Sequence, residues 1–116
     1  MRIRKRIKKG SNALTTQWMG SDYKIQFEIT SFENGKTKII CHTIEDFDEP
    51  FCILTTEQRT RTCFEKDAIY AFFSKQTYGV AQTLINQGFA VPTGERNQDG
   101  DLMYRLDMKK IKIFSY

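Results

Sequence analysis

The sequence contains little proline and glycine and no long apolar run. Only 2 prolines and 7 glycines occur among 116 residues, which is not the composition of a collagenous or low-complexity chain. No stretch approaches the roughly 20 apolar residues that a bilayer-spanning helix requires. Hydrophobic residues nevertheless make up 40% of the chain, so a domain of this length can bury a core without disulfides or metal ions. We therefore expect one soluble domain.

Metal, cofactor and nucleophilic sites have few residues to build on. Cys41, Cys52 and Cys63 are spaced 11 residues apart, so there is no C-x-x-C pair of the kind that binds zinc. The only histidine, His42, follows Cys41, and neighbours on a strand point to opposite faces. A cysteine nucleophile would need His42 to meet Cys52 or Cys63 in the fold, and no flanking signature suggests it. Phosphate-binding glycine loops are absent as well. The sequence predicts no metal, no cofactor and three reduced thiols in a cytoplasmic protein.

Positive charge is concentrated at the start of the chain. Six of the 18 basic residues fall within the first ten positions, with no acid among them: Arg2, Arg4, Lys5, Arg6, Lys8 and Lys9. The rest of the chain carries 12 basic residues (18 less 6) against 14 acidic ones, a net charge of −2. The first acid is Asp22. We therefore divide the chain into a basic, polar N-terminal arm over 1–21 and a single domain over 22–116.

The basic arm favours a polyanionic partner. Dense positive charge attracts phosphate backbones by Coulomb force and by counterion release, without needing a fixed fold. Three other interpretations stay open: a solvated tail or first strand, a mitochondrial or nuclear targeting segment, and a short amphipathic helix that lies on an anionic membrane through Ile3 and Ile7. The start has no apolar segment of the kind that marks a secretory signal.

The first half of the chain predicts strands. Residues 23–29 alternate apolar and polar side chains, and residues 36–43 read as the return strand. Between them lies Asn34-Gly35, the dipeptide most typical of a tight hairpin turn. An acidic loop then leads to a short buried strand at 51–55. Residues 59–64 alternate and are rich in threonine, which favours another strand over the alternative of a helix that starts at Thr55.

The second half predicts helices and then strands. Asp67 looks like an N-cap for a short helix over 69–73, and a second helix over 78–87 ends at Gly88. Short strands follow at 89–91, 102–107 and 109–114, the first two separated by a polar loop over 92–101 with an Asp99-Gly100 turn. The expected fold is α+β, a small, mainly antiparallel sheet of about half a dozen strands with one or two helices packed on one face.

Two motifs with known chemistry match this sequence weakly. Residues 77–107 have the element order of a winged helix, whose helix enters the DNA major groove. However, residues 76–87 contain no lysine or arginine, and the following loop has a net charge of −2, which disfavours a DNA backbone. Asp107-Met-Lys109, with Asp99 and Asp101 upstream, could bind Mg²⁺ as in some nucleases. This pattern is short and common by chance, so a nuclease is only a minor alternative.

We therefore predict a non-enzymatic binding module for nucleic acid or a nucleoprotein complex. The arm would supply affinity, and Lys109, Lys110 and Lys112 would extend the basic surface if the C-terminal segment lies beside the arm. The alternative is a protein-interaction module, such as a small inhibitor or adaptor of a host enzyme. Its partner-binding residues would be the aromatic side chains Trp18, Phe47 and Tyr78.

Overall fold

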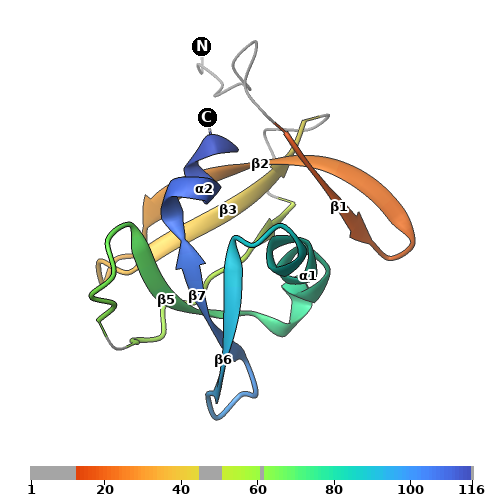
Figure 1. Cartoon of the computed structure of the whole chain (residues 1–116). Helices are drawn as coiled ribbons and strands as arrows, with labels where there is room; N and C mark the ends of the chain where they lie inside the picture. The colour runs from red at the N-terminus through yellow and green to blue at the C-terminus, as the bar shows by residue number, and fades with distance from the viewer. Residues whose placement is uncertain (1–12, 45–50, 61, 116) are drawn as a thin grey trace.

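The protein has an α+β fold, which confirms the predicted class (Figure 1). The structure is a computed structural model that describes residues 13–44, 51–60 and 62–115. Within these residues, seven strands form two antiparallel sheets, one of four strands and one of three. Two α-helices and one short 3-10 helix complete the fold. No helix among the described residues has the length and apolar character needed to cross a membrane.

The first sheet contains the predicted hairpin. Its strands, in spatial order, are β1 (Leu14–Trp18), β2 (Ser21–Ser31), β3 (Thr37–Thr43) and β4 (Cys52–Ile53). The Asn34-Gly35 turn joins β2 to β3 as predicted. Gly35 adopts a φ of 84°, a conformation that favours glycine, and the Phe32 N–H donates to the Lys36 carbonyl at 2.8 Å. The short strand predicted at 51–55 is present as β4, but it covers only Cys52 and Ile53 and is partly exposed where a buried strand was expected.

Strand β1 lies within the segment that the sequence analysis assigned to the arm. It pairs with β2 over its whole length, from Leu14 opposite Ile25 to Trp18 opposite Ser21. Leu14 and Thr16 are buried. The first sheet therefore begins at Leu14, while residues 1–12, which include all six basic residues of the arm, lie outside the described residues.

The second sheet is built around the predicted strand at 102–107. Its strands, in spatial order, are β5 (Ala68–Phe73), β7 (Leu102–Asp107) and β6 (Ala90–Arg96). The strand predicted at 89–91 continues to Arg96 through Pro92. Proline is tolerated there because β6 is an edge strand, and the register with β7 is irregular between Pro92 and Arg96. The turn at Asp99-Gly100 is present, with a φ of 82° at Gly100.

The helix predicted over 69–73 is wrong, because these residues form strand β5. Ala71, Phe72 and Phe73 are all buried although they are consecutive, as happens when both faces of a strand are covered. A continuous apolar run of this kind matches helical spacing as well as strand spacing. Asp67 does not cap a helix; it has a φ of 59° at the turn that enters β5.

The strands predicted at 59–64 and 109–114 are also wrong. The described residues of 59–64 form an irregular loop, in which the Thr60 hydroxyl donates to the Tyr70 carbonyl at 3.1 Å and Phe64 is 96% exposed. Residues 108–113 form helix α2 (Met108–Ile113). The Asp107 carboxylate accepts a hydrogen bond from the Lys110 N–H at 3.1 Å and so caps this helix.

The other helix confirms its prediction. A 3-10 turn, η1 (Lys75–Thr77), leads directly into α1 (Tyr78–Asn86). The chain leaves α1 through Gly88, which has a φ of 77°, and the Phe89 N–H donates to the Leu84 carbonyl at 2.8 Å. This arrangement satisfies carbonyl groups at the end of the helix.

The two sheets share one hydrophobic core. The chain after β4 connects them, because the Leu54 N–H donates to Ile39 of β3 and the Thr56 N–H donates to Phe72 of β5, at 2.9 and 3.0 Å. Leu54 itself is fully buried. Both helices add to the core, α1 through Leu84 and α2 through Ile111. In Figure 1 the long β2–β3 hairpin crosses over the second sheet.

Candidate functional site

Helix α2 displays three lysines on one side and buries the other. Met108 and Ile111 pack into the core, while Lys109, Lys110 and Lys112 are exposed. At about 100° per residue, the three lysines spread over the side of the helix that faces away from the core. The acid at the start of this helix is the Asp107 carboxylate, whose Oδ2 lies 4.0 Å from Lys110 Nζ. One carboxylate therefore offsets only part of this positive charge.

The end of α2 is anchored to β2. The Phe27 N–H of β2 donates to the Phe114 carbonyl at 3.0 Å, and Ser115 pairs with Phe27 in parallel. The Phe114 ring lies 5.5 Å from the ring of Phe89. Figure 1 shows α2 (blue) beside β2 (orange). The lysines of α2 are therefore carried by an element with a fixed position in the fold.

The start of β1 lies at the same edge of β2. Leu14 pairs with Ile25 and Ser115 pairs with Phe27, two residues further along β2. Both must lie on one edge, because Cys41 of β3 already occupies the other side of Phe27. The chain that carries the basic arm thus joins the fold next to the end of α2. The three lysines lie on a helix in place of the expected strand, and the basic residues of the arm lie outside the described residues.

Trp18 belongs to an aromatic cluster at the other end of β1. Its ring lies 5.3 Å from the ring of Phe51, which in turn lies 4.9 Å from the ring of Tyr23. A groove of about 390 Å³ lies beside the cluster. Its lining residues are Trp18, Phe51, Cys52, Ile53, Thr55, Ser74, Gln76 and Thr77. Tyr78 follows the lining residue Thr77 in the chain and is 39% exposed. Phe47 lies outside the described residues.

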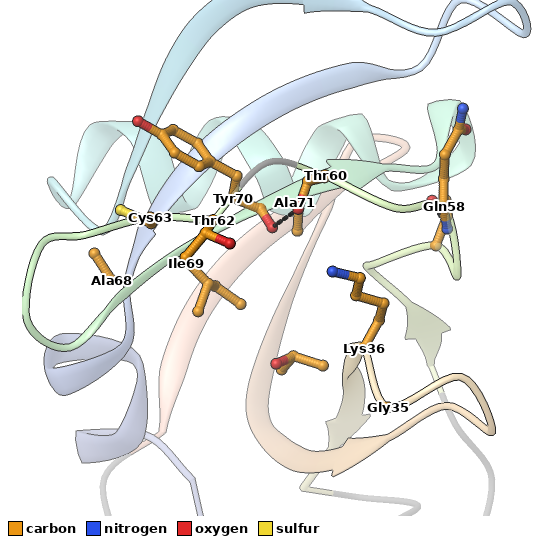
Figure 2. Close-up of a pocket in the computed structure, with 12 residues that line it drawn as sticks. Gly35, Lys36, Gln58, Thr60, Thr62, Cys63, Ala68, Ile69, Tyr70 and Ala71 are labelled. Atoms are coloured by element: carbon orange, nitrogen blue, oxygen red, sulfur yellow. Dashed lines mark hydrogen bonds between the residues drawn. The ribbon is translucent and has the colours of Figure 1, made fainter.

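A second pocket lies between the β2–β3 turn, the loop after β4 and strand β5 (Figure 2). It has a volume of about 270 Å³. Its lining residues are Gly35, Lys36, Thr37, Thr56, Gln58, Thr60, Thr62, Cys63, Ala68, Ile69, Tyr70 and Ala71. Lys36 is the one charged side chain in this lining. The Thr60 hydroxyl already donates its hydrogen bond to the Tyr70 carbonyl. The lining contains no acid–base pair, so nothing in it points to catalysis.

Helix α1 lacks the positive charge that positions the recognition helix of a winged helix on DNA. The order of helix and hairpin predicted for 77–107 is present, but β1 packs along α1. The Thr16 and Thr83 hydroxyls lie 2.7 Å apart in a hydrogen bond. A Cβ atom on Gly79 would lie only 2.8 Å from the Gln17 carbonyl oxygen. The groove between these elements is lined by uncharged residues, so it lacks the cations that position a recognition helix.

The acids of the nuclease motif do not come together. Asp101 precedes β7 and Asp107 ends it, which separates them by about 20 Å at the rise of an extended strand. Each carboxylate has a local partner: Asp101 accepts from the Asn97 amide at 3.1 Å, and Asp107 caps α2. In the part of the chain that the structure describes, no group of three or more histidine, cysteine and acidic residues is placed to hold a metal ion.

His42 and the cysteines do not form a nucleophilic site. His42 Nε2 lies 3.0 Å from the Glu28 carboxylate, on the face of the sheet opposite Cys41. Cys41 instead lies directly opposite Cys52 on the neighbouring strand, and Cys63 lines the separate pocket of Figure 2. Sequence analysis missed the Cys41–Cys52 pair, because only the register of β3 and β4 brings the two residues together.

Comparisons with protein-family models, with curated proteins and with solved structures found no match.

Proposed function

We propose that the protein is a non-enzymatic module that binds nucleic acid or nucleoprotein through the basic arm and α2. The observation that carries the proposal is that Leu14 and Ser115 pair with neighbouring positions on one edge of β2. Lys109, Lys110 and Lys112 belong to α2, whose end meets β2 beside the start of β1, and the six basic residues Arg2 to Lys9 precede β1 in the sequence. Three unpaired thiols fit a reducing, cytoplasmic location for such a module.

The charge of this surface sets the size of the expected effect. Binding to duplex DNA changes with salt by a log–log slope of about −0.9 for each phosphate neutralised. Six cations in the arm alone would give a slope of about −5, and three more from α2 would make it about −8. The contribution of α2 is therefore measurable separately from that of the arm.

The test is a salt series of binding to generic duplex DNA and to single-stranded RNA. Four proteins are compared: the intact chain, a chain that lacks residues 2–9, the triple variant K109Q/K110Q/K112Q, and the matched control R59Q/K75Q/R96Q. The control residues are exposed: Arg59 lies in the loop after β4, Lys75 in η1 and Arg96 at the end of β6. This control variant removes the same number of positive charges from a different part of the fold.

We expect the deletion to abolish most binding and the α2 variant to flatten the duplex slope by about 2 to 3. The control should keep the slope of the intact chain. Equal slopes for the α2 variant and the control would refute the role of α2. Salt-independent or absent binding in all four proteins would refute the nucleic-acid proposal.

The rival proposal is a protein-interaction module that uses the groove beside Trp18. One observation favours it: Ile53, which lines this groove beside the aromatic cluster, is 41% exposed, and Tyr78, which follows the lining residue Thr77, is 39% exposed. Binding of this kind would survive deletion of residues 2–9 and would be lost on Tyr78→Ala with Ile53→Ser. A pull-down that compares the Tyr78→Ala, Ile53→Ser chain with the chain that lacks residues 2–9 separates the two proposals.

A further inference from the structure

Two of the three cysteines face each other across neighbouring strands. Cys41 of β3 is the direct partner of Cys52 of β4. Directly opposed residues of an antiparallel pair project to the same face, with their Cβ atoms about 4.5 to 5.5 Å apart. A disulfide requires Cβ atoms about 3.5 to 4.5 Å apart and Cα atoms about 4.4 to 6.8 Å apart. The register therefore places Cys41 and Cys52 side by side on one face of the sheet, at a separation close to that of a disulfide.

Both cysteines are free thiols in this structure. Burial, and secondarily the neighbouring Cys52 side chain, raises the pKa of the Cys41 thiol well above its usual range. Cys41 is therefore a protonated thiol at neutral pH.

The two thiols differ in access to solvent. Cys41 is fully buried in the core, whereas Cys52 is half-buried and lines the groove beside Trp18 and Phe51. A small reagent in this groove meets Cys52 before it can meet Cys41. Cys63 lies in the loop that follows β4 and lines the separate pocket between that loop and β5. It therefore does not compete with Cys41 or Cys52 for a reagent in the groove.

We propose that Cys41 and Cys52 form a reversible internal disulfide by exchange with a small disulfide such as oxidised glutathione. The Cys52 thiolate attacks one sulfur of the reagent, whose S–S bond breaks and releases one thiolate. Cys41 then loses its proton and attacks the Cys52 sulfur, which expels the second reagent thiolate. The two cysteines lose two protons and two electrons, and the reagent is reduced to two thiols.

The disulfide would close a ring from residue 41 to residue 52 and tie β4 to β3. A β4 of two residues has few ladder hydrogen bonds of its own, so a covalent link at this position restrains it directly. Closing a ring of this length restricts the unfolded chain, which should raise the Tm by roughly 10 °C. Cytosolic disulfides are usually transient and redox-responsive, which is the behaviour this site would give.

The test is to incubate the intact chain in buffers of increasing ratio of oxidised to reduced glutathione. Denaturing thiol titration should fall from three free thiols to one. Intact mass should show the loss of two hydrogens without a glutathione adduct, and peptide mapping should join Cys41 to Cys52. Reduction with excess dithiol should restore all three thiols and the original Tm.

Single variants separate the roles of the cysteines. Cys63→Ser should keep the reaction and the rise in Tm. Cys41→Ser should leave a stable glutathione adduct on Cys52. Cys52→Ser should abolish the fast oxidation of Cys41 by oxidised glutathione. A persistent glutathione adduct on Cys52 of the unmodified chain, or a disulfide that includes Cys63, would overturn the proposal. Because these two outcomes are read on the intact chain, the proposal stays testable even if a core variant folds poorly.

Discussion

The substitution Gly79→Ala tests the contact that holds α1 against β1. This glycine lies in the first turn of α1 and does not have a positive φ, so alanine is allowed by the backbone there. A Cβ atom would nevertheless lie 2.8 Å from the Gln17 carbonyl oxygen and 3.1 Å from Trp18 Cε3. The first of these neighbours is backbone and cannot rotate away. We therefore expect Gly79→Ala to be destabilising.

Two opposing effects set the magnitude. Alanine is favoured over glycine within a helix by about 1 kcal/mol. Overpacking an extra methyl group against a rigid neighbour typically costs about 1 to 3 kcal/mol. The net expectation is a loss of about 1 kcal/mol in the free energy of unfolding. If α1 did not press on β1, the same change would stabilise the protein by about 1 kcal/mol, so the sign decides the question.

Urea denaturation followed by far-UV circular dichroism measures this difference. The control is Gln82→Ala in the same helix, an exposed position where we expect a change within about 0.5 kcal/mol. A Gly79→Ala protein that is as stable as the parent chain, or more stable, would refute the close packing of α1 on β1.

Two other predictions concern a helix cap and a buried thiol. Asp107→Ala removes the cap of α2 and should lower the free energy of unfolding by about 1 kcal/mol, whereas Asp107→Asn should recover most of it; equal losses in thermal unfolding would argue against capping. The raised pKa of Cys41 means that the folded state holds this proton more tightly than the unfolded state. Its contribution to stability is complete below the ordinary thiol pKa and is lost as the pH rises towards the folded pKa, by up to about 1.4 kcal/mol per pH unit. Urea titrations of the reduced chain from about pH 8 to 9.5 should show this decline, and Cys41→Val should reduce it; an equal decline in the variant would contradict the assignment. Burial also raises the pKa of Tyr104, which adds a decline in stability of the same sign only above about pH 10.

Local signals predicted the elements whose ends depend on local conformation. Asn34-Gly35 specifies a tight turn because its residues accept positive φ, and Gly88 ends α1 for the same reason. The strand at 102–107 was predictable because one side of it faces the core and its side chains alternate. Each of these signals acts over a few residues and does not depend on distant contacts.

Local signals were ambiguous where tertiary packing covers more than one face. The apolar run that ends in Phe72 and Phe73 matches helical spacing, and only the covering of both faces makes it a strand. In the last segment, Ile111 and Ile113 alternate as in a strand. The core accepts Met108 and Ile111 instead, three residues apart, and Asp107 caps the resulting helix.

The sequence alone determined the charge of this protein, and the tertiary structure decided where that charge can act. The sequence places six basic residues near the start and three near the end, but no local pattern says how the two ends of the chain lie. The pairing of Ser115 with Phe27, next to that of Leu14 with Ile25, brings the end of the last helix beside the start of β1. The Cys41–Cys52 pair likewise depends on strand register. Contacts between residues far apart in sequence form only when the whole core packs, and so they cannot be deduced from local preference.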